Sequence, residues 1–203
     1  MVAVMTLTRR RTLALGPLAL IGCGVALAEE SQGMNIDSLN RPPPLASNGA
    51  AWRLYSDQVM GGVSLGDLCW ESVAGRPAIR MQGDVSLENN GGFLQMSLDL
   101  VPGGGAFDAS RFAGIELEVT GNDETYGLHL RSLDCLRPWQ SYRQAFVATP
   151  TWRRLRLPFA GFAPHRIDLP LDLARLRRIG LVAIGRAFAA DLAVGRIAFY
   201  DEG

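Results

Sequence analysis

Glu116 and Glu118 come closest, in residue type and spacing, to a catalytic pair. They alternate with Ile115, Leu117 and Val119 in a run typical of a β-strand, so both carboxylates project from one face, about 6.5–7 Å apart at the backbone. That separation is compatible with the acid and nucleophile of a glycosidase. Nothing in the neighbouring sequence would give the two carboxyls the different environments that such catalysis needs. We therefore expect a protein that is not an enzyme, and keep a glycosidase as the third hypothesis.

The other residue types that carry chemistry are scarce. His129 and His165 are the only histidines, and neither belongs to a metal-ligand pattern. The sequence has no nucleophile elbow, phosphate loop or dinucleotide fingerprint. Cys69 and Cys135 could form one disulfide in an oxidising compartment, or could remain two separate buried thiols. We predict no cofactor and no metal; no cluster of ligands supports calcium.

Polar side chains alternate with apolar ones in two further runs. His129 and Arg131 share one face of such a run, and the polar residues of 93–100 share another. If the apolar faces form one core, these polar faces and that of Glu116 and Glu118 line one exposed, concave sheet that could bind a ligand. The alternative is an ordinary solvated face with weak ion pairs.

Aromatic residues near arginines supply further candidate contacts. Trp152 and Arg154 would share a strand face, and Tyr142 lies in the preceding strand-like run. Tryptophan, tyrosine and arginine are typical of protein-binding hot spots and of sugar-stacking platforms. Trp152 could equally belong to the core, in a strand that leads into a sharp turn. Pro158 must end that strand or lie at a sheet edge, because proline has no backbone N–H to donate.

Two turn-rich stretches are the least generic part of the chain. Residues 56–64 read Ser-Asp-Gln-Val-Met-Gly-Gly-Val-Ser, and residues 87–93 read Leu-Glu-Asn-Asn-Gly-Gly-Phe. A local role would have the aspartate accept backbone hydrogen bonds while the paired glycines allow a tight crossing. A binding role would expose backbone amides and polar side chains to a ligand. The candidate binding residues here are Asp57, Met60, Gly61, Gly62, Ser64, Asn89 and Asn90.

The two stretches resemble the complex I intermediate-associated protein 30 domain family, and this chain looks like a bacterial member. Later pieces come in the family's order: Tyr-Arg-Gln-Ala-Phe at 142–146, Trp152, then Leu-Pro-Phe at 157–159. The resemblance covers about residues 50–201. The chain departs from the family pattern at Arg166-Ile167, where the family has Arg-Gly.

The resemblance implies a galactose-binding-like jelly roll, an all-β sandwich that binds without catalysis. Eukaryotic members help to assemble respiratory complex I, so it also implies a protein partner and a role as a chaperone-like assembly or stability factor. The alternative is a carbohydrate-binding module that uses the concave sheet, with Trp152 or Tyr142 as the stacking platform.

The spacing of apolar runs and turn signals independently predicts a sandwich or barrel. At most one short helix is expected, within 171–178, where Leu173 and Leu176 could share a face. The expected strands are 63–72, 78–85, 93–100, 114–120, 126–133, 141–148, 152–157, 179–184 and 191–200.

The N-terminus, 1–28, has the layout of an export signal. Three arginines at 9–11 precede an apolar run that ends in Ala26-Leu27-Ala28, which predicts cleavage before Glu29 and resembles a twin-arginine signal. We therefore expect a periplasmic protein. Leu-Ile-Gly-Cys at 20–23 also resembles a lipobox, so a lipoprotein anchored at Cys23 is the alternative.

Residues 29–49 are polar and contain three consecutive prolines, so we expect a tether there and a folded domain at 50–203. Three of the 20 basic residues and none of the 20 acidic ones lie in the signal, which leaves a mature charge of −3. This charge favours neither nucleic acid nor an anionic membrane surface, so membrane contact is expected only through the signal or a lipid anchor.

Overall fold

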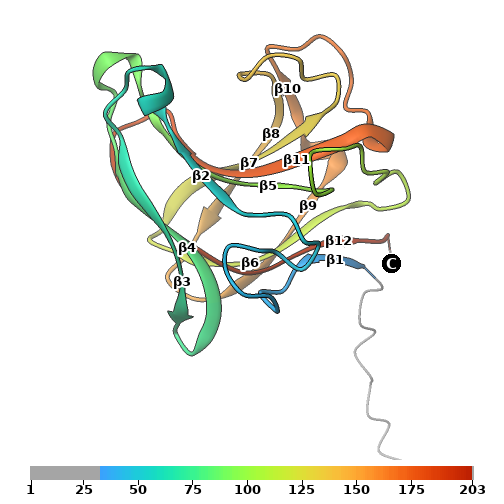
Figure 1. The fold of residues 1–203 in the computed structure, drawn as a ribbon, viewed down its shortest axis with the longest axis horizontal. Coiled ribbons are helices and arrows are strands. Elements are labelled where there is room, and N and C mark those ends of the chain that lie inside the picture. The colour runs from blue at the N-terminus through green and yellow to red at the C-terminus, as the bar shows by residue number, and fades with distance from the viewer. Residues whose placement is uncertain (1–32, 203) are drawn as a thin grey trace, which may run out of the picture. The chain divides into compact units, whose positions relative to one another are not determined.

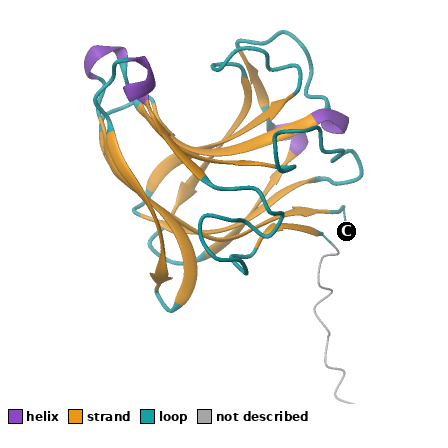
Figure 2. Cartoon of the chain, viewed as in Figure 1, coloured by secondary structure: helices purple, strands orange, loops and turns teal. Residues whose placement is uncertain are grey.

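The computed structural model describes residues 33–202, which form a sandwich of two antiparallel β-sheets (Figures 1 and 2). The first sheet has the strand order β3-β4-β12-β6-β9, with β1 also paired to β12, and the second has the order β10-β8-β7-β11-β5-β2. The first sheet consists of β1 (Met34–Asp37), β3 (Leu65–Val73), β4 (Arg76–Val85), β6 (Gly114–Gly121), β9 (Arg153–Pro158) and β12 (Phe188–Tyr200). The second consists of β2 (Arg53–Ser56), β5 (Phe93–Asp99), β7 (Glu124–Ser132), β8 (Ser141–Ala148), β10 (Ala163–His165) and β11 (Leu176–Ile184).

The apolar faces predicted from alternation form the core between the sheets. Leu94 and Met96 of β5, Leu128 of β7, and Ile115 and Leu117 of β6 are all completely buried. Burying each such side chain contributes about 1.5–3 kcal/mol relative to leaving it in water. The all-β jelly-roll prediction is confirmed, and each of the nine predicted strands overlaps an observed one.

The single short helix allowed for within 171–178 does not form, which agrees with a fold of at most one short helix. Only Leu173–Arg175 turns, as a short 3₁₀ segment, η4, and β11 begins at Leu176. Leu176 is fully buried and exchanges backbone hydrogen bonds with Phe107. Strand pairing satisfies more of this segment's backbone groups than one helical turn would. The other described helical segments, η1 (Asp57–Met60), η2 (Glu88–Asn90) and η3 (Phe159–Gly161), are also 3₁₀ turns.

The tether predicted for 29–49 is wrong from residue 34 onward, because 34–49 is part of the folded domain. Strand β1 pairs with β12, and Ile36 is buried in the core. The buried carboxylate of Asp37 accepts hydrogen bonds from the backbone of Leu39 and Ser47 and, at 2.7 Å, from the indole Nε1 of Trp52. These buried contacts fix the segment against the sandwich.

The predicted export signal at 1–28, its cleavage site and Cys23 lie outside the described residues. Among residues 33–202, no helix is long and apolar enough to cross a membrane.

Candidate ligand-binding groove

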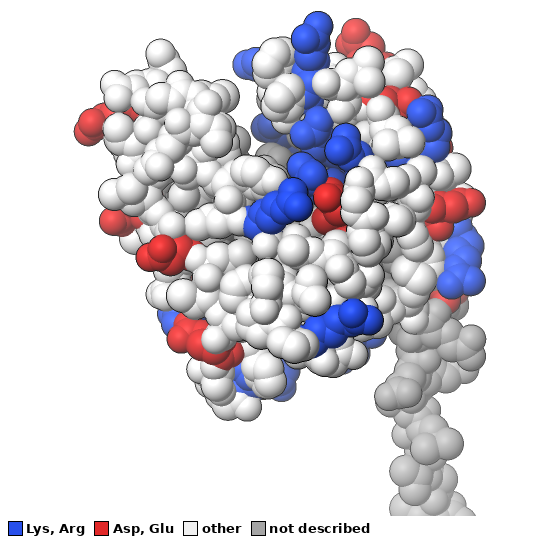
Figure 3. All heavy atoms as spheres, in the orientation of Figure 1, with Lys and Arg blue, Asp and Glu red and all other residues white. Residues whose placement is uncertain are grey.

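The outer face of the second sheet is hollowed into a groove of about 670 Å³. Its floor comes from β5, β7, β8 and β11, and its sides come from the loops around η1 and between β7 and β8. The space-filling view shows a cleft in which the side chains of basic residues gather (Figure 3).

Polar groups in the floor of the groove are left without protein partners. The Gln95 amide packs over Gly180 in the floor, and an added Cβ at Gly180 would lie 2.8 Å from the amide nitrogen. Within residues 33–202, neither the Gln95 amide nor the imidazole of His129 takes part in a hydrogen bond. Because no described protein group occupies their donors and acceptors, both side chains are free to contact a ligand.

His129 is only 8% exposed. Burial, the charge of Arg143 and then that of His165 lower the pKa of its imidazole to about 3. The pKa of His165 is also lowered, by burial and by the charges of Arg143 and Arg166. The buried imidazole is therefore neutral at physiological pH, and the positive charge of the groove comes from arginine.

Four arginines line the groove: Arg131, Arg143, Arg166 and Arg178. Arg178 donates to Asp99 at 2.6 Å, and Arg131 donates to the carbonyls of Cys135 and Arg137. In the part of the chain that the structure describes, only Arg178 of the four has a carboxylate within 4 Å. Burial is the main cause of the lowered pKa of both Arg131 and Arg143.

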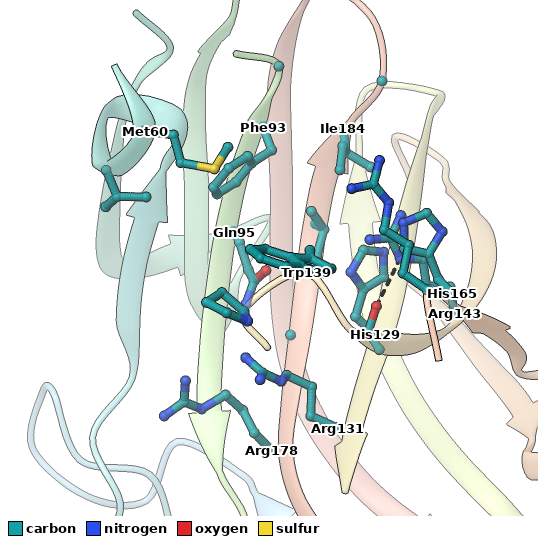
Figure 4. A pocket seen from close by; sticks show the side chains of 18 of the residues that line it. Met60, Phe93, Gln95, His129, Arg131, Trp139, Arg143, His165, Arg178 and Ile184 are labelled. Atoms are coloured by element: carbon teal, nitrogen blue, oxygen red, sulfur yellow. Dashed lines mark hydrogen bonds between the residues drawn. The ribbon is translucent and has the colours of Figure 1, made fainter. Parts of the chain in front are cut away.

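The walls combine apolar and polar side chains (Figure 4). Met60, which is 64% exposed, and Phe93 lie on one side of the close-up, and His165 and Arg143 lie on the other. Trp139, from the loop between β7 and β8, lies between them and is 51% exposed. The groove thus combines an accessible indole with polar and cationic groups.

The carboxylate of Asp57 holds the Met60 wall in place. Asp57 is completely buried and accepts hydrogen bonds from the backbone N–H groups of Ser64, Gly92 and Phe93 and from the Ser64 hydroxyl. An added Cβ at Gly62 would lie 2.4 Å from this carboxylate. The two turn-rich stretches therefore meet around one buried charge, which explains their aspartate and their paired glycines.

Burial raises the pKa of Asp57, but the hydrogen bonds from Ser64, Gly92 and Phe93 outweigh burial and leave the pKa below its usual value. The other candidates in these stretches serve the turns. Gly61, at φ 90°, ends η1 with a left-handed residue, and Asn89 and Asn90 adopt positive φ outside the groove lining. Only Met60 of the seven candidates lines the groove.

Three further residues were predicted for the binding site but lie away from the groove: Tyr142, Trp152 and Arg154. Tyr142 points into the core with 1% exposure, and its hydroxyl lies within hydrogen-bond distance of the carbonyls of Leu169 and Pro170, so it cannot stack on a ligand. Trp152 precedes β9 of the first sheet, is half-buried and donates to the Val73 carbonyl. Arg154, on β9, forms ion pairs with glutamates of the same sheet. His129 and Arg131 do line the groove.

The prediction of a single polar face is also wrong. Glu116 and Glu118 lie on β6 of the first sheet, whereas His129 and Arg131 lie on β7 of the second. Glu116 is 4% exposed and accepts hydrogen bonds from Arg156 and Arg196, and Glu118 accepts one from Arg154. This surface matches the alternative expectation of a sheet face with ion pairs.

Cys69 and Cys135 are free thiols, so the structure does not contain the disulfide that was one of the two expectations. Cys69 is exposed on β3 of the first sheet, and Cys135 is buried after β7 of the second. Cys69 was expected to be buried beside Trp70, but its side of β3 faces solvent. No group of three potential metal ligands occurs among residues 33–202.

Several groove residues were not among the predicted site residues. Arg143 and Arg178 occupy the outward positions of β8 and β11, and alternation from the buried Tyr142 and Ile179 would have found them. Trp139 lies in an irregular loop, where no periodicity indicates which way a side chain points.

Solved structures with this fold include carbohydrate-binding modules. A family 11 module from Clostridium thermocellum, in complex with a β-1,3-1,4-mixed-linked tetrasaccharide, has a TM-score of 0.63 and 13% identity over 83% of this chain and 95% of its own. A family 30 module of a cellulosomal cellulase of Clostridium thermocellum has a TM-score of 0.50 and 12% identity over 69% of this chain and 92% of its own. An exo-β-agarase has a TM-score of 0.53 and 9% identity over 84% of this chain and 25% of its own. At these identities the likeness shows the fold alone.

No curated protein matches the chain. The family model for Complex I intermediate-associated protein 30 (CIA30) matches residues 44–194, which is most of the chain and includes both turn-rich stretches around Asp57. The chain therefore belongs to the Complex I intermediate-associated protein 30 family.

Proposed function

We propose that this protein is a non-catalytic carbohydrate-binding domain that holds a sugar chain in the groove. The observation that carries the proposal is the accessible indole of Trp139 beside a floor with unpartnered polar groups, Gln95 and His129. Sugar rings have apolar C–H faces that pack on an indole and hydroxyl edges that need directional hydrogen bonds. The groove offers both in one place.

The comparisons support the same proposal. The fold is that of carbohydrate-binding modules, one of which was solved with a bound tetrasaccharide. The groove lining contains arginine and neutral histidine as its ionisable groups and contains no aspartate or glutamate. Glycoside hydrolysis normally uses two carboxyl groups that flank the scissile bond, so the lining favours binding over turnover.

Binding is tested by isothermal titration calorimetry of the full-length protein with a panel of neutral and charged oligosaccharides. Loss of a well-placed aromatic contact costs about 1–3 kcal/mol, so Trp139→Ala should weaken binding about 10-fold or more. Leu136→Ala is the matched control, because Leu136 is exposed in the same loop but does not line the groove. No binding by the wild type, or equal loss in both variants, would refute the proposal.

A protein partner is the second candidate, favoured by exposed apolar side chains on the loops that Asp57 joins. Val59 and Met60 on η1, Leu65 at the start of β3 and Leu87 before η2 are all well exposed. Exposed apolar side chains that gather in one patch commonly mark a protein-interaction site. The family's name suggests an assembly role. Because we also propose that the chain is exported to the periplasm, the partner would belong to the cell envelope.

The two candidates differ in which variant removes binding. A protein partner held by η1 should be lost from the double variant Val59→Asp, Met60→Asp and retained by Trp139→Ala. Affinity purification of both variants from the host, followed by mass spectrometry, checks this. If the same partner is recovered equally from both variants, η1 is not its docking site.

A further inference from the structure

We propose that the sugar chain in the groove is acidic, with anionic groups held by the groove arginines. This inference rests on the proposed function and adds the chemical class of the ligand. The side chains that line the groove carry positive charge. The lining residues include four arginines and no carboxylate, and one aspartate, Asp99, pairs with Arg178 beside it.

Arg131 and Arg178 place two like charges directly opposite each other on neighbouring strands. The pairing of β7 with β11 sets Arg131 against Arg178. Like charges at such positions destabilise a sheet. Asp99 lies beside Arg178, whereas Arg131 has only the carbonyls of Cys135 and Arg137. An anionic group between the two guanidinium groups would turn this repulsion into attraction.

Arg143 and Arg166 form a second cationic pair. Both residues line the same groove, and burial and then the positive charge of Arg166 lower the pKa of Arg143. Arg143 donates only to the Ser141 hydroxyl, at 2.9 Å, and Arg166 is exposed. Neither has a carboxylate within 4 Å among residues 33–202.

The two pairs are separated along the groove. His129 lies opposite Arg143, so Arg131, two residues further along β7, is a diagonal neighbour of Arg143, about 7–8 Å away at the backbone. In the close-up, Arg131 and Arg178 lie at one end of the groove and Arg143 at its side, and Trp139 lies above Arg131 beside Gln95 (Figure 4). A ligand that fits this arrangement has a stackable ring and more than one anionic group, as an acidic oligosaccharide has.

Arginine is well suited to this chemistry. Its planar guanidinium binds carboxylate and other oxyanions through two parallel hydrogen bonds, and it stays charged when partly buried. Carboxylated and sulfated sugars share the anionic chemistry that the groove fits, so both belong in the test. An acidic peptide would also bring negative charge, but it would lack the ring for Trp139.

The test is calorimetry of the full-length protein with an oligogalacturonate, a sulfated galactan oligosaccharide and a neutral mixed-linked β-glucan oligosaccharide. At least one acidic sugar should bind about 10-fold or more tightly than the neutral one, because each charge-assisted hydrogen bond is worth more than a neutral one. This preference should shrink when the ionic strength rises from about 0.05 M to about 0.5 M. The acidic sugar that binds shows whether the groove recognises carboxylate or sulfate groups.

The matched variants are Arg143→Gln, Arg166→Gln on the groove and Arg41→Gln, Arg153→Gln elsewhere. Both remove two positive charges, and Arg41 and Arg153 are exposed and do not line the groove. The groove variant should lose about 10-fold or more in affinity for the acidic sugar and clearly less for the neutral one. The control variant should bind both like the wild type, and circular dichroism checks that each variant is folded.

The outcomes separate the two proposals. If no sugar binds, the proposed function fails, and the present inference fails with it. If the neutral and acidic sugars bind equally and independently of salt, the function stands and acidic specificity is refuted. If poly-glutamate binds as tightly as the acidic sugar and is equally retained by Trp139→Ala, the groove recognises charge without a ring, and the inference is overturned.

Discussion

The two outer sheet faces use the same residue, arginine, in opposite ways. On the first sheet, Arg154, Arg156 and Arg196 surround the carboxylate of Glu116, and Glu118 accepts from Arg154. On the second sheet, the groove arginines have one carboxylate, Asp99, among the described residues. Paired arginines stabilise a surface, whereas unpaired arginines over a groove leave charge for a ligand. Whether an arginine is paired with a carboxylate therefore distinguishes a structural face from a binding face better than the residue type alone.

The largest effect that we expect is from Asp57→Ala, which removes the support of one groove wall. The buried carboxylate joins η1 to the start of β5, and its loss leaves the N–H groups of Ser64, Gly92 and Phe93 without their acceptor. Since each hydrogen bond to a charged group is worth about 1.5–3 kcal/mol, the free energy of unfolding should fall by about 3 kcal/mol or more. Urea denaturation measures this change.

Asp67→Ala is the control, because Asp67 is exposed on β3 and its carboxylate has no hydrogen-bond partner among the described residues. The lowered pKa of Asp57 adds a pH signature. A carboxyl with a depressed folded pKa stabilises the fold above its unfolded pKa of about 3.9, and this contribution is lost as the pH falls through the folded value. Asp57→Asn should therefore reduce the loss of stability in acid. An unchanged acid profile would contradict the proposed role of the carboxylate.

Glu116→Gln should give the next largest effect. The substitution removes the charge that Arg154, Arg156 and Arg196 share, but these arginines are partly exposed and water compensates some of the loss. We expect the free energy of unfolding to fall by about 1–2 kcal/mol, below the range for a fully buried pair. Glu88→Gln, at an exposed glutamate in η2 whose side chain accepts no hydrogen bond from the described residues, should change it little. Equal effects would mean that the first sheet's ion pairs do not stabilise it.

A smaller effect is expected from His129, which lies neutral between the groove arginines. Its folded pKa of about 3 lies below the unfolded value of about 6.5, so the unfolded chain binds a proton first as the pH falls. Stability should therefore decrease below pH 6.5, with this group costing about 1 kcal/mol between pH 7 and pH 5.5. Thermal melts of His129→Gln should show a flatter pH profile than those of His165→Gln, because His165 is less buried. Parallel profiles for both variants would show that His129 is not held neutral.

The fold could be predicted from sequence because it depends on local alternation. Leu128 and Leu130 alternate with His129 and Arg131, and this period alone decides which side chains enter the core. Alternation does not reveal which strands share a sheet. Glu116 and His129 were therefore placed on one face, although long-range pairing puts them in different sheets.

The site could be predicted only in part, for two physical reasons. Met60, His129 and Arg131 lie in a recognisable motif or on a regular strand, whereas Trp139 lies in a loop whose direction depends on tertiary contacts. The same dependence on tertiary contacts applies to the proline-rich segment that was expected to be a tether. The hydrogen bond from Trp52 to Asp37 holds this segment against the domain, and no local sequence pattern indicates it.

The smallest effect on stability should come from Arg143→Gln, Arg166→Gln. Neither arginine forms an ion pair among the described residues, and burial and then the charge of Arg166 lower the pKa of Arg143. The variant loses the hydrogen bond from Arg143 to the Ser141 hydroxyl. Surface substitutions that break no ion pair change the free energy of unfolding by about 0.5 kcal/mol or less, and removing repulsion acts in the stabilising direction. Urea denaturation should therefore give a value equal to or slightly above that of the wild type. A clear loss, of the size expected for Glu116→Gln, would show that the groove arginines are structural, and the contrast between the two faces would disappear.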